Sequence, residues 1–120
     1  IATMPVMVTG GIRRLAVAQE VLAQQVDMVG IATALAICPE LPGLWQQGDD
    51  PAPQLRPVTW KTKPLASLAN MAMVKYQLRK VSKQRQAQPG VAPRWAFLTQ
   101  QIEDLRRTRR YKIKMAKLTE

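Results

Sequence analysis

Residues 4–11 read MPVMVTGG, a short apolar and β-branched run that ends in a pair of glycines. Near-continuous hydrophobicity of this kind is typical of a strand buried on both faces, as in parallel sheets. The glycine pair marks the end of the strand, because glycine tolerates the backbone conformations of tight turns. We therefore predict a strand up to Thr9, followed by a turn at Gly10 and Gly11.

The residues that follow predict a helix and then a second strand. Residues 15–25 are rich in strong helix formers, and Leu15, Ala18 and Leu22 repeat at the spacing of one buried helix face. A second apolar run follows at residues 28–31. The connection between the two runs is too long for a hairpin and long enough for a parallel crossover. We expect a βαβ unit, which needs further strands and helices to cover its faces.

The next stretch predicts short helices and then a break in regular structure. Residues 33–37 (TALAI) form a short helix that Pro39 stops, and residues 40–47 form a second helical piece. Residues 49–64 are rich in proline and predict a linker. Residues 65–120 are then expected to form a basic helical tail. The chain is thus divided into a βαβα piece over residues 1–48, the linker and this tail.

Two long helices are expected in the tail, over residues 65–84 and 95–117. Each carries an apolar stripe at three- and four-residue spacing, which predicts the face that packs. The stripes consist of Leu68, Met71, Leu78 and Val81 in the first helix and Trp95, Leu98, Ile102 and Leu105 in the second. Met71 and Met73 are expected to fill gaps between packed helices. Glu103 can pair with Arg107 four residues later.

The positive charge lies in the second half of the chain. Through Trp60 there are 3 basic and 5 acidic residues, and from Lys61 there are 15 basic and 3 acidic residues, for a total of +10. A cationic half can bind nucleic acid, an anionic membrane surface or an acidic partner, or it can be a solvated helix face. Nucleic acid is disfavoured because there is no groove-reading motif, and aromatic residues that could stack on bases are scarce.

Several kinds of chemistry are excluded by composition. The chain has no histidine and one cysteine, Cys38. It therefore has no Ser-His or Cys-His pair, no imidazole metal ligand, no zinc cluster and no internal disulfide. No secretory signal opens the sequence, and no apolar run reaches the roughly 20 residues that cross a bilayer, so a cytoplasmic location is expected.

The strand ends are the best candidate for a binding site. Without a Cβ at Gly10 and Gly11, the backbone can approach a ligand, and N–H groups at such a turn form an anion-binding concavity. A helix beginning near Ala32 and Thr33 offers further N–H groups on the same side of the sheet. In a β/α barrel, the loops after strands seven and eight form the recurring phosphate site. The alternative is that the glycine pair is only a tight turn.

Residues 4–48 resemble the end of the Old Yellow Enzyme family of NADH:flavin oxidoreductases. Residues 5–13 (PVMVTGGIR) are similar to the family's seventh strand and glycine turn, and residues 27–31 (DMVGI) to its eighth strand. Residues 38–42 (CPELP), followed by Trp45 and Gly48, are similar to the stretch after that strand. The tail, with its late Arg109-Arg110-Tyr111, loosely resembles the C-terminal helices of one subgroup.

The resemblance implies an α/β fold, namely the last two β/α units of an FMN-binding TIM (β/α)8 barrel followed by a helical C-terminal tail. The barrel is incomplete as given, because a whole one needs roughly 250 residues. In the family, FMN takes hydride from NADH or NADPH and passes it to an activated alkene. The family's histidine pair and proton-donating tyrosine lie on earlier strands. No catalytic residue and no metal ligand is therefore predicted here, and the chain alone is expected to be inactive.

The resemblance also implies which residues hold the cofactor. Gly10 and Gly11 would give backbone N–H groups to the FMN phosphate. The family's next phosphate contact is a Gly-Arg pair, which reads Ala32-Thr33 in this chain. Alanine can still donate its N–H, but threonine offers a hydroxyl group in place of a permanently charged guanidinium. Arg13 and the neighbouring Arg14 are the candidates to replace that charge, and the alternative is that both are simply exposed.

Two other hypotheses for the function of the chain remain. The chain could be a small basic binding protein for nucleic acid or an acidic partner, because of its cationic second half. It could also associate with itself, or with a larger chain, through exposed strand edges.

Overall fold

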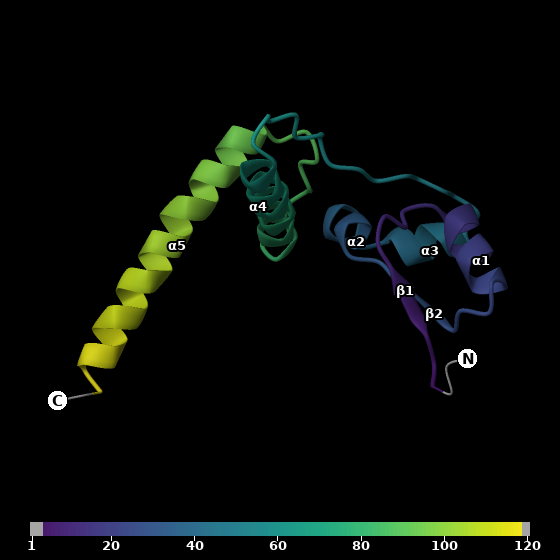
Figure 1. Cartoon of the computed structure of the whole chain (residues 1–120), viewed down its shortest axis with the longest axis horizontal. Helices are drawn as coiled ribbons and strands as arrows, with labels where there is room; N and C mark the ends of the chain where they lie inside the picture. The colour runs from purple at the N-terminus through teal and green to yellow at the C-terminus, as the bar shows by residue number, and fades with distance from the viewer. Residues whose placement is uncertain (1–3, 119–120) are drawn as a thin grey trace.

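The structure, a computed structural model, describes residues 4–118 and has a mixed α/β fold that is mostly helical. In chain order, the elements are β1 (Met7–Thr9), α1 (Leu15–Ala23), β2 (Met28–Gly30), α2 (Thr33–Ile37), α3 (Leu41–Gln46), α4 (Lys63–Val81) and α5 (Pro93–Ala116). The two strands and the first three helices form one end of the molecule, and α4 and α5 form the other (Figure 1).

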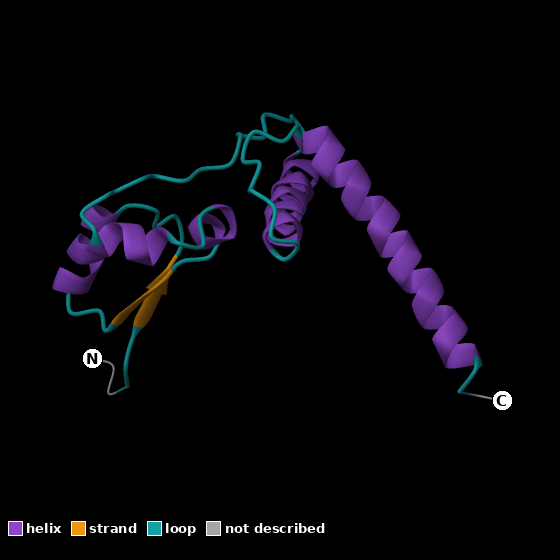
Figure 2. Cartoon of the chain, turned by 180° about the vertical axis from the view of Figure 1, so that it is seen from behind, coloured by secondary structure: helices purple, strands orange, loops and turns teal. Residues whose placement is uncertain are grey.

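The two strands pair in parallel, as the crossover length predicts, and α1 connects them (Figure 2). The register joins Met7 to Met28, Val8 to Val29, and Thr9 to Gly30. Asp27 fixes the start of this pairing, because its Oδ2 accepts a hydrogen bond from the Val6 N–H at 2.7 Å. The Val6 carbonyl in turn accepts the N–H of Asp27 at 3.1 Å.

The strands are more exposed than their hydrophobicity predicts. Met7 is 55% exposed and Met28 is 51% exposed, so the prediction of a strand buried on both faces is wrong for the described residues. The reason is that the described sheet has only two strands, each with one unpaired edge. The apolar side chains therefore lack the neighbouring layers that bury a parallel sheet.

Helix α1 begins at Leu15, as the sequence predicts, and its N-terminus is capped by a residue that lies far away in the sequence. Its own N-cap residue, Arg14, makes no side-chain capping hydrogen bond. Instead, Asp50 Oδ1 accepts the Leu15 N–H at 2.7 Å. A carboxylate at this position satisfies one of the unpaired N–H groups of the first helical turn. The proline-rich segment that contains Asp50 is thus tied back to the βαβ unit.

The segment between α3 and α4 has no helix or strand, but it packs on the tail. Leu55 and Val58 contact a core cluster of Ala72, Met73 and Ala96. The N–H of Arg56 donates to the Pro89 carbonyl at 3.0 Å. Nearby, the rings of Trp60 and Phe97 meet edge to face, with 6.0 Å between their centroids.

Helices α4 and α5 pack around a cluster of Ala72, Met73 and Ala96, and not through the predicted apolar stripes. Ala69, Ala72, Met73 and Ala96 are buried. The stripe residues are exposed by 55% at Leu68, 56% at Met71, 51% at Leu78, 56% at Trp95, 52% at Leu98, 41% at Ile102 and 71% at Leu105, whereas Val81 is partly buried. The prediction of these packing faces is therefore wrong. Alanine allows two helix backbones to approach closely, so it marks the contact although it is only weakly apolar.

A polar network joins the two tail helices beside this core. Arg79 Nη1 lies 2.8 Å from Glu103 Oε1, and Arg79 also donates to the Gln100 side chain. Gln100 is 6% exposed and donates in turn to Asp104. The expected Glu103–Arg107 pair is confirmed at 3.8 Å, but it lies at the surface, where such pairs stabilise little.

The overall shape is open. The Cα radius of gyration is 18.3 Å, whereas a compact domain of this length has a radius of about 13.6 Å. The accessible surface is 9370 Å², against about 6500 Å² for a compact monomer of this mass. Much apolar surface is thus left uncovered in the chain. Among the described residues, no helix is both long enough and apolar enough to cross a membrane.

The sheet depends on a glycine at position 30. A Cβ added there would overlap the Thr9 methyl group on the paired strand and crowd Met7. We expect Gly30→Ala to lower the free energy of unfolding of the sheet by about 1 kcal/mol, because exposed Thr9 can shift in part. Gly43→Ala is the matched control, since nothing lies within 4 Å of its added Cβ in α3. Amide exchange at Val29 should quicken in the first variant and not in the second.

Candidate functional site

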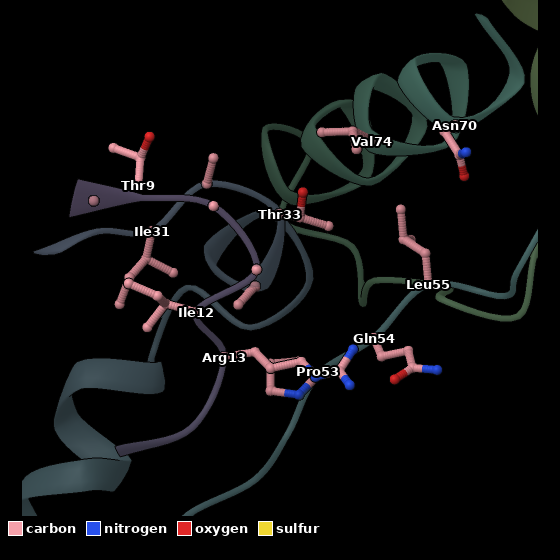
Figure 3. A pocket seen from close by; sticks show the side chains of 15 residues that line it. Thr9, Ile12, Arg13, Ile31, Thr33, Pro53, Gln54, Leu55, Asn70 and Val74 are labelled. Carbon is pink, nitrogen blue, oxygen red and sulfur yellow. The ribbon is translucent and has the colours of Figure 1, made fainter. Parts of the chain in front are cut away.

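A cleft of about 740 Å³ lies at the carboxyl ends of β1 and β2 (Figure 3). Because the strands are parallel, both ends lie at the same edge of the sheet, where α/β proteins commonly bind ligands. The loop after β1 contributes residues 9–13, and the segment after β2 contributes residues 30–34. Residues 53–55, together with Asn70 and Val74 of α4, complete the lining.

All four of the predicted cofactor-binding residues line this cleft. Gly10 and Gly11 come from the turn after β1, and Ala32 and Thr33 come from the segment that opens α2. The parallel register explains this proximity, since it aligns Thr9 with Gly30 and starts both loops at the same level. The structure thus brings the predicted residues together, and their binding of a cofactor stays a prediction.

The glycine turn presents its backbone to the cleft. Gly10 has a φ of 115° and Gly11 has a φ of 68°, conformations that side-chain-bearing residues rarely adopt. Nothing lies within 4 Å of a Cβ added at either position, so the space above the turn is open. None of the turn and loop hydrogen bonds of the described residues uses the N–H of Gly11 or Thr33. Both N–H groups are therefore available to an anion.

Arg13 is the only charged side chain among the described residues that line the cleft, and Arg14 is outside the lining. Arg13 extends from the glycine turn toward Pro53 and Gln54 (Figure 3). A guanidinium with no carboxylate in the lining makes the cleft favourable for a phosphate group. Of the two arginines considered from the sequence, the structure places Arg13 at the site.

The far wall of the cleft has no local signal in the sequence. Leu55 belongs to the proline-rich segment, and Asn70 and Val74 belong to α4 (Figure 3). Asn70 and Val74 reach the cleft because α2 packs against α4. This contact joins elements far apart in the chain, so sequence patterns alone could not reveal it.

Other reactive groups are absent from the cleft. No cluster of three or more His, Cys, Asp or Glu residues within residues 4–118 could hold a metal ion. Cys38 lies outside the cleft lining, and the pKa of its thiol is raised by burial and then by the nearby Glu40 carboxylate. A raised pKa keeps the thiol protonated and weakly nucleophilic near neutral pH. The cleft therefore offers binding groups, and no nucleophile or acid–base pair.

Comparison with protein-family models, with curated proteins and with solved structures finds no match for this chain. What the cleft binds must therefore be inferred from its own residues.

Proposed function

We propose that this chain is the C-terminal part of an FMN-dependent NAD(P)H:flavin oxidoreductase of the Old Yellow Enzyme type, and that it binds the FMN phosphate. One observation carries the proposal. Gly10, Gly11, Ala32 and Thr33 come from two successive strand ends and line one cleft together with Arg13. This is the arrangement of the recurring phosphate site of β/α barrels, which the loops after the last two strands form.

The residues of the cleft are suited to a phosphate group. The backbone N–H groups of Gly10 and Gly11 would donate to its oxygens, as in other anion-binding concavities. The hydroxyl and N–H of Thr33 would donate from the second strand end, and Arg13 would supply the positive charge. A cleft of about 740 Å³ is within the usual range for a cofactor site.

When bound, FMN would supply hydride transfer from NADH or NADPH to an alkene-type substrate. The present chain would anchor and orient its phosphate end. Because the chain has no histidine, the groups that contact the substrate in this family would come from other segments of the enzyme. We accordingly expect no turnover from these 120 residues alone, and we place the complete enzyme in the cytoplasm.

The two-stranded sheet supports the proposal that this chain forms the end of a larger barrel. Its strands are parallel and joined by a helical crossover, and each has one unpaired edge in the described chain. Met7 and Met28 are half-exposed and would be covered by neighbouring strands and helices of a closed barrel. In the isolated chain the same edges would favour self-association, which a mass measurement in solution would detect.

Ligand titration of the 120-residue chain, followed by amide NMR, tests the proposal. FMN should shift the amide signals of Gly10, Gly11, Ala32 and Thr33, and inorganic phosphate should shift the same signals. Riboflavin, which lacks the phosphate, should shift them far less. Equal responses to FMN and riboflavin, or no response to millimolar FMN, would rule out a phosphate site in this cleft.

Arg13 gives the proposal a sharper test. We expect Arg13→Gln to weaken phosphate and FMN binding about tenfold, because one charge-assisted hydrogen bond is lost. Arg14→Gln removes the same charge one residue away, outside the cleft lining, and should change binding less than twofold. Isothermal titration calorimetry measures both. Similar losses in the two variants would show that net charge attracts the ligand, without a contact from Arg13.

A further inference from the structure

The second half of α5 and the turn after it carry an unusual concentration of positive charge. We call residues 105–118 the basic arm. It contains no acidic residue, and all of its residues are exposed. Its seven basic residues are Arg106, Arg107, Arg109, Arg110, Lys112, Lys114 and Lys117. This segment holds more than a third of the 18 lysines and arginines of the chain.

The charge of the basic arm is not neutralised within the described residues. Among the described residues, the carboxylates nearest along the chain precede the arm, where Glu103 pairs with Arg79 and Asp104 accepts from Gln100. Arg107 reaches Glu103 at 3.8 Å, and no other basic side chain of the arm has an ion-pair partner among residues 4–118. The helix also runs away from α4 and from the rest of the molecule (Figures 1 and 2). The basic arm is therefore accessible on all sides.

The positions of the charges form two rows along the helix. Arg106, Arg110 and Lys114 follow one another at four-residue spacing, which places them along one side. Arg109 and Lys112 form a second row, whose centre lies about 130° around the helix from the first at 3.6 residues per turn. Two separated rows of charge suit a partner that presents negative charge on two walls.

The apolar residues of the basic arm do not gather on one side. Ile113 lies between the two basic rows and Leu105 lies between Arg109 and Lys112, whereas Tyr111, at 64% exposure, and Met115 lie on the far side of the helix. A helix that lies on a membrane surface needs one continuous apolar face opposite a charged one. The arrangement therefore disfavours a lipid surface.

We propose that the basic arm binds the phosphate backbone of double-stranded nucleic acid, independently of the cleft. A helix with its side chains is about 10–12 Å wide, and the major groove of B-DNA is about 12 Å wide. In such a groove each basic row would face one phosphate wall. Phosphate contacts position a protein without reading bases. The lack of a groove-reading motif therefore argues against sequence specificity, and not against this kind of binding.

Fluorescence anisotropy with a labelled 20-base-pair DNA duplex tests the proposal on the 120-residue chain. The variant R106Q/R110Q/K114Q removes three charges from the arm. The control K61Q/K63Q/K83Q removes three exposed charges elsewhere. At 0.1 M salt we expect the arm variant to bind at least about tenfold more weakly than the control, and the slope of log K against log salt to fall by about 3. Glutamine favours helices, so circular dichroism should show little loss of helix.

Three results would overturn this proposal. Equal weakening in both variants would mean that total charge, and not the basic arm, governs binding. Undetectable binding of the unmodified chain at 50 mM salt would exclude a phosphate-backbone site. Tighter binding to vesicles rich in phosphatidylserine, or to polyglutamate, than to the duplex would assign the arm to a lipid or an acidic protein surface instead. None of these outcomes depends on FMN binding, so the two proposals can fail separately.

Discussion

Replacing Met73 with alanine should lower the free energy of unfolding of the α4–α5 unit by about 2–5 kcal/mol. Met73 is fully buried and belongs to the cluster with Ala72 and Ala96. The other members of that cluster are alanines, so no larger buried side chain could fill the space left behind. The loss should be at the upper end of the range if Leu55, on the covering segment, cannot move inward.

Met71 provides the matched control for this experiment. It lies two residues away in the same helix and is 56% exposed, so Met71→Ala should change stability by less than about 0.5 kcal/mol. Urea unfolding followed by helical circular dichroism measures both variants. The fluorescence of Trp60, which packs on Phe97, reports on the same unit. Equal costs at the two positions would mean that α4 presents a different face to α5.

Local signals in the sequence predict much of the fold. The helix-forming run after the glycine turn gives α1, which begins at Leu15 in both the prediction and the structure. Its crossover length correctly predicts the parallel pairing of β1 and β2. The proline-rich segment separates α3 from α4 as expected, although α4 begins two residues before its predicted start. These features depend on residues close together in the chain, which sequence patterns describe well.

The packing of the helices could not be predicted in the same way. The pattern favoured Leu68 and Leu98 as buried residues because they are large and apolar, whereas the helices meet through Ala72 and Ala96. Which face of a helix is buried depends on what covers it, and here the cover includes an irregular segment around Val58. Such a segment has no periodicity that would reveal its contacts.

The candidate site could likewise be predicted from the sequence only in part. Gly10, Gly11, Ala32 and Thr33 could be grouped from sequence, because parallel strands place their carboxyl ends at one edge. The wall made by Asn70 and its neighbours could not, because it depends on the packing of α2 against α4. The choice of Arg13 over the adjacent arginine likewise required the geometry of the turn.

Gln77 is a structural residue that sequence patterns gave no reason to single out. It is fully buried, and its side-chain amide pairs with the backbone of Gln88 in the loop between α4 and α5. The Gln77 Nε2 donates to the Gln88 carbonyl at 2.8 Å, and the Gln88 N–H donates to the Gln77 Oε1 at 2.7 Å. The Tyr76 hydroxyl adds a hydrogen bond to the Gln88 side chain at 3.0 Å. This loop is thus held to α4 by side chains and not by a strand or helix.

We expect Gln77→Leu to lower the free energy of unfolding by about 2–4 kcal/mol, because two hydrogen bonds are lost and two backbone groups lose their partners. The amide of Gln88 should exchange with solvent much faster, and trypsin should cleave sooner after Arg85 in the same loop. Gln101→Leu is the control, since Gln101 is exposed on α5 and should change neither property. An unchanged exchange rate at Gln88 in the Gln77 variant would mean that other contacts hold the loop. Faster exchange there, with α5 remaining protected, would assign to Gln77 a local role in holding the loop between α4 and α5.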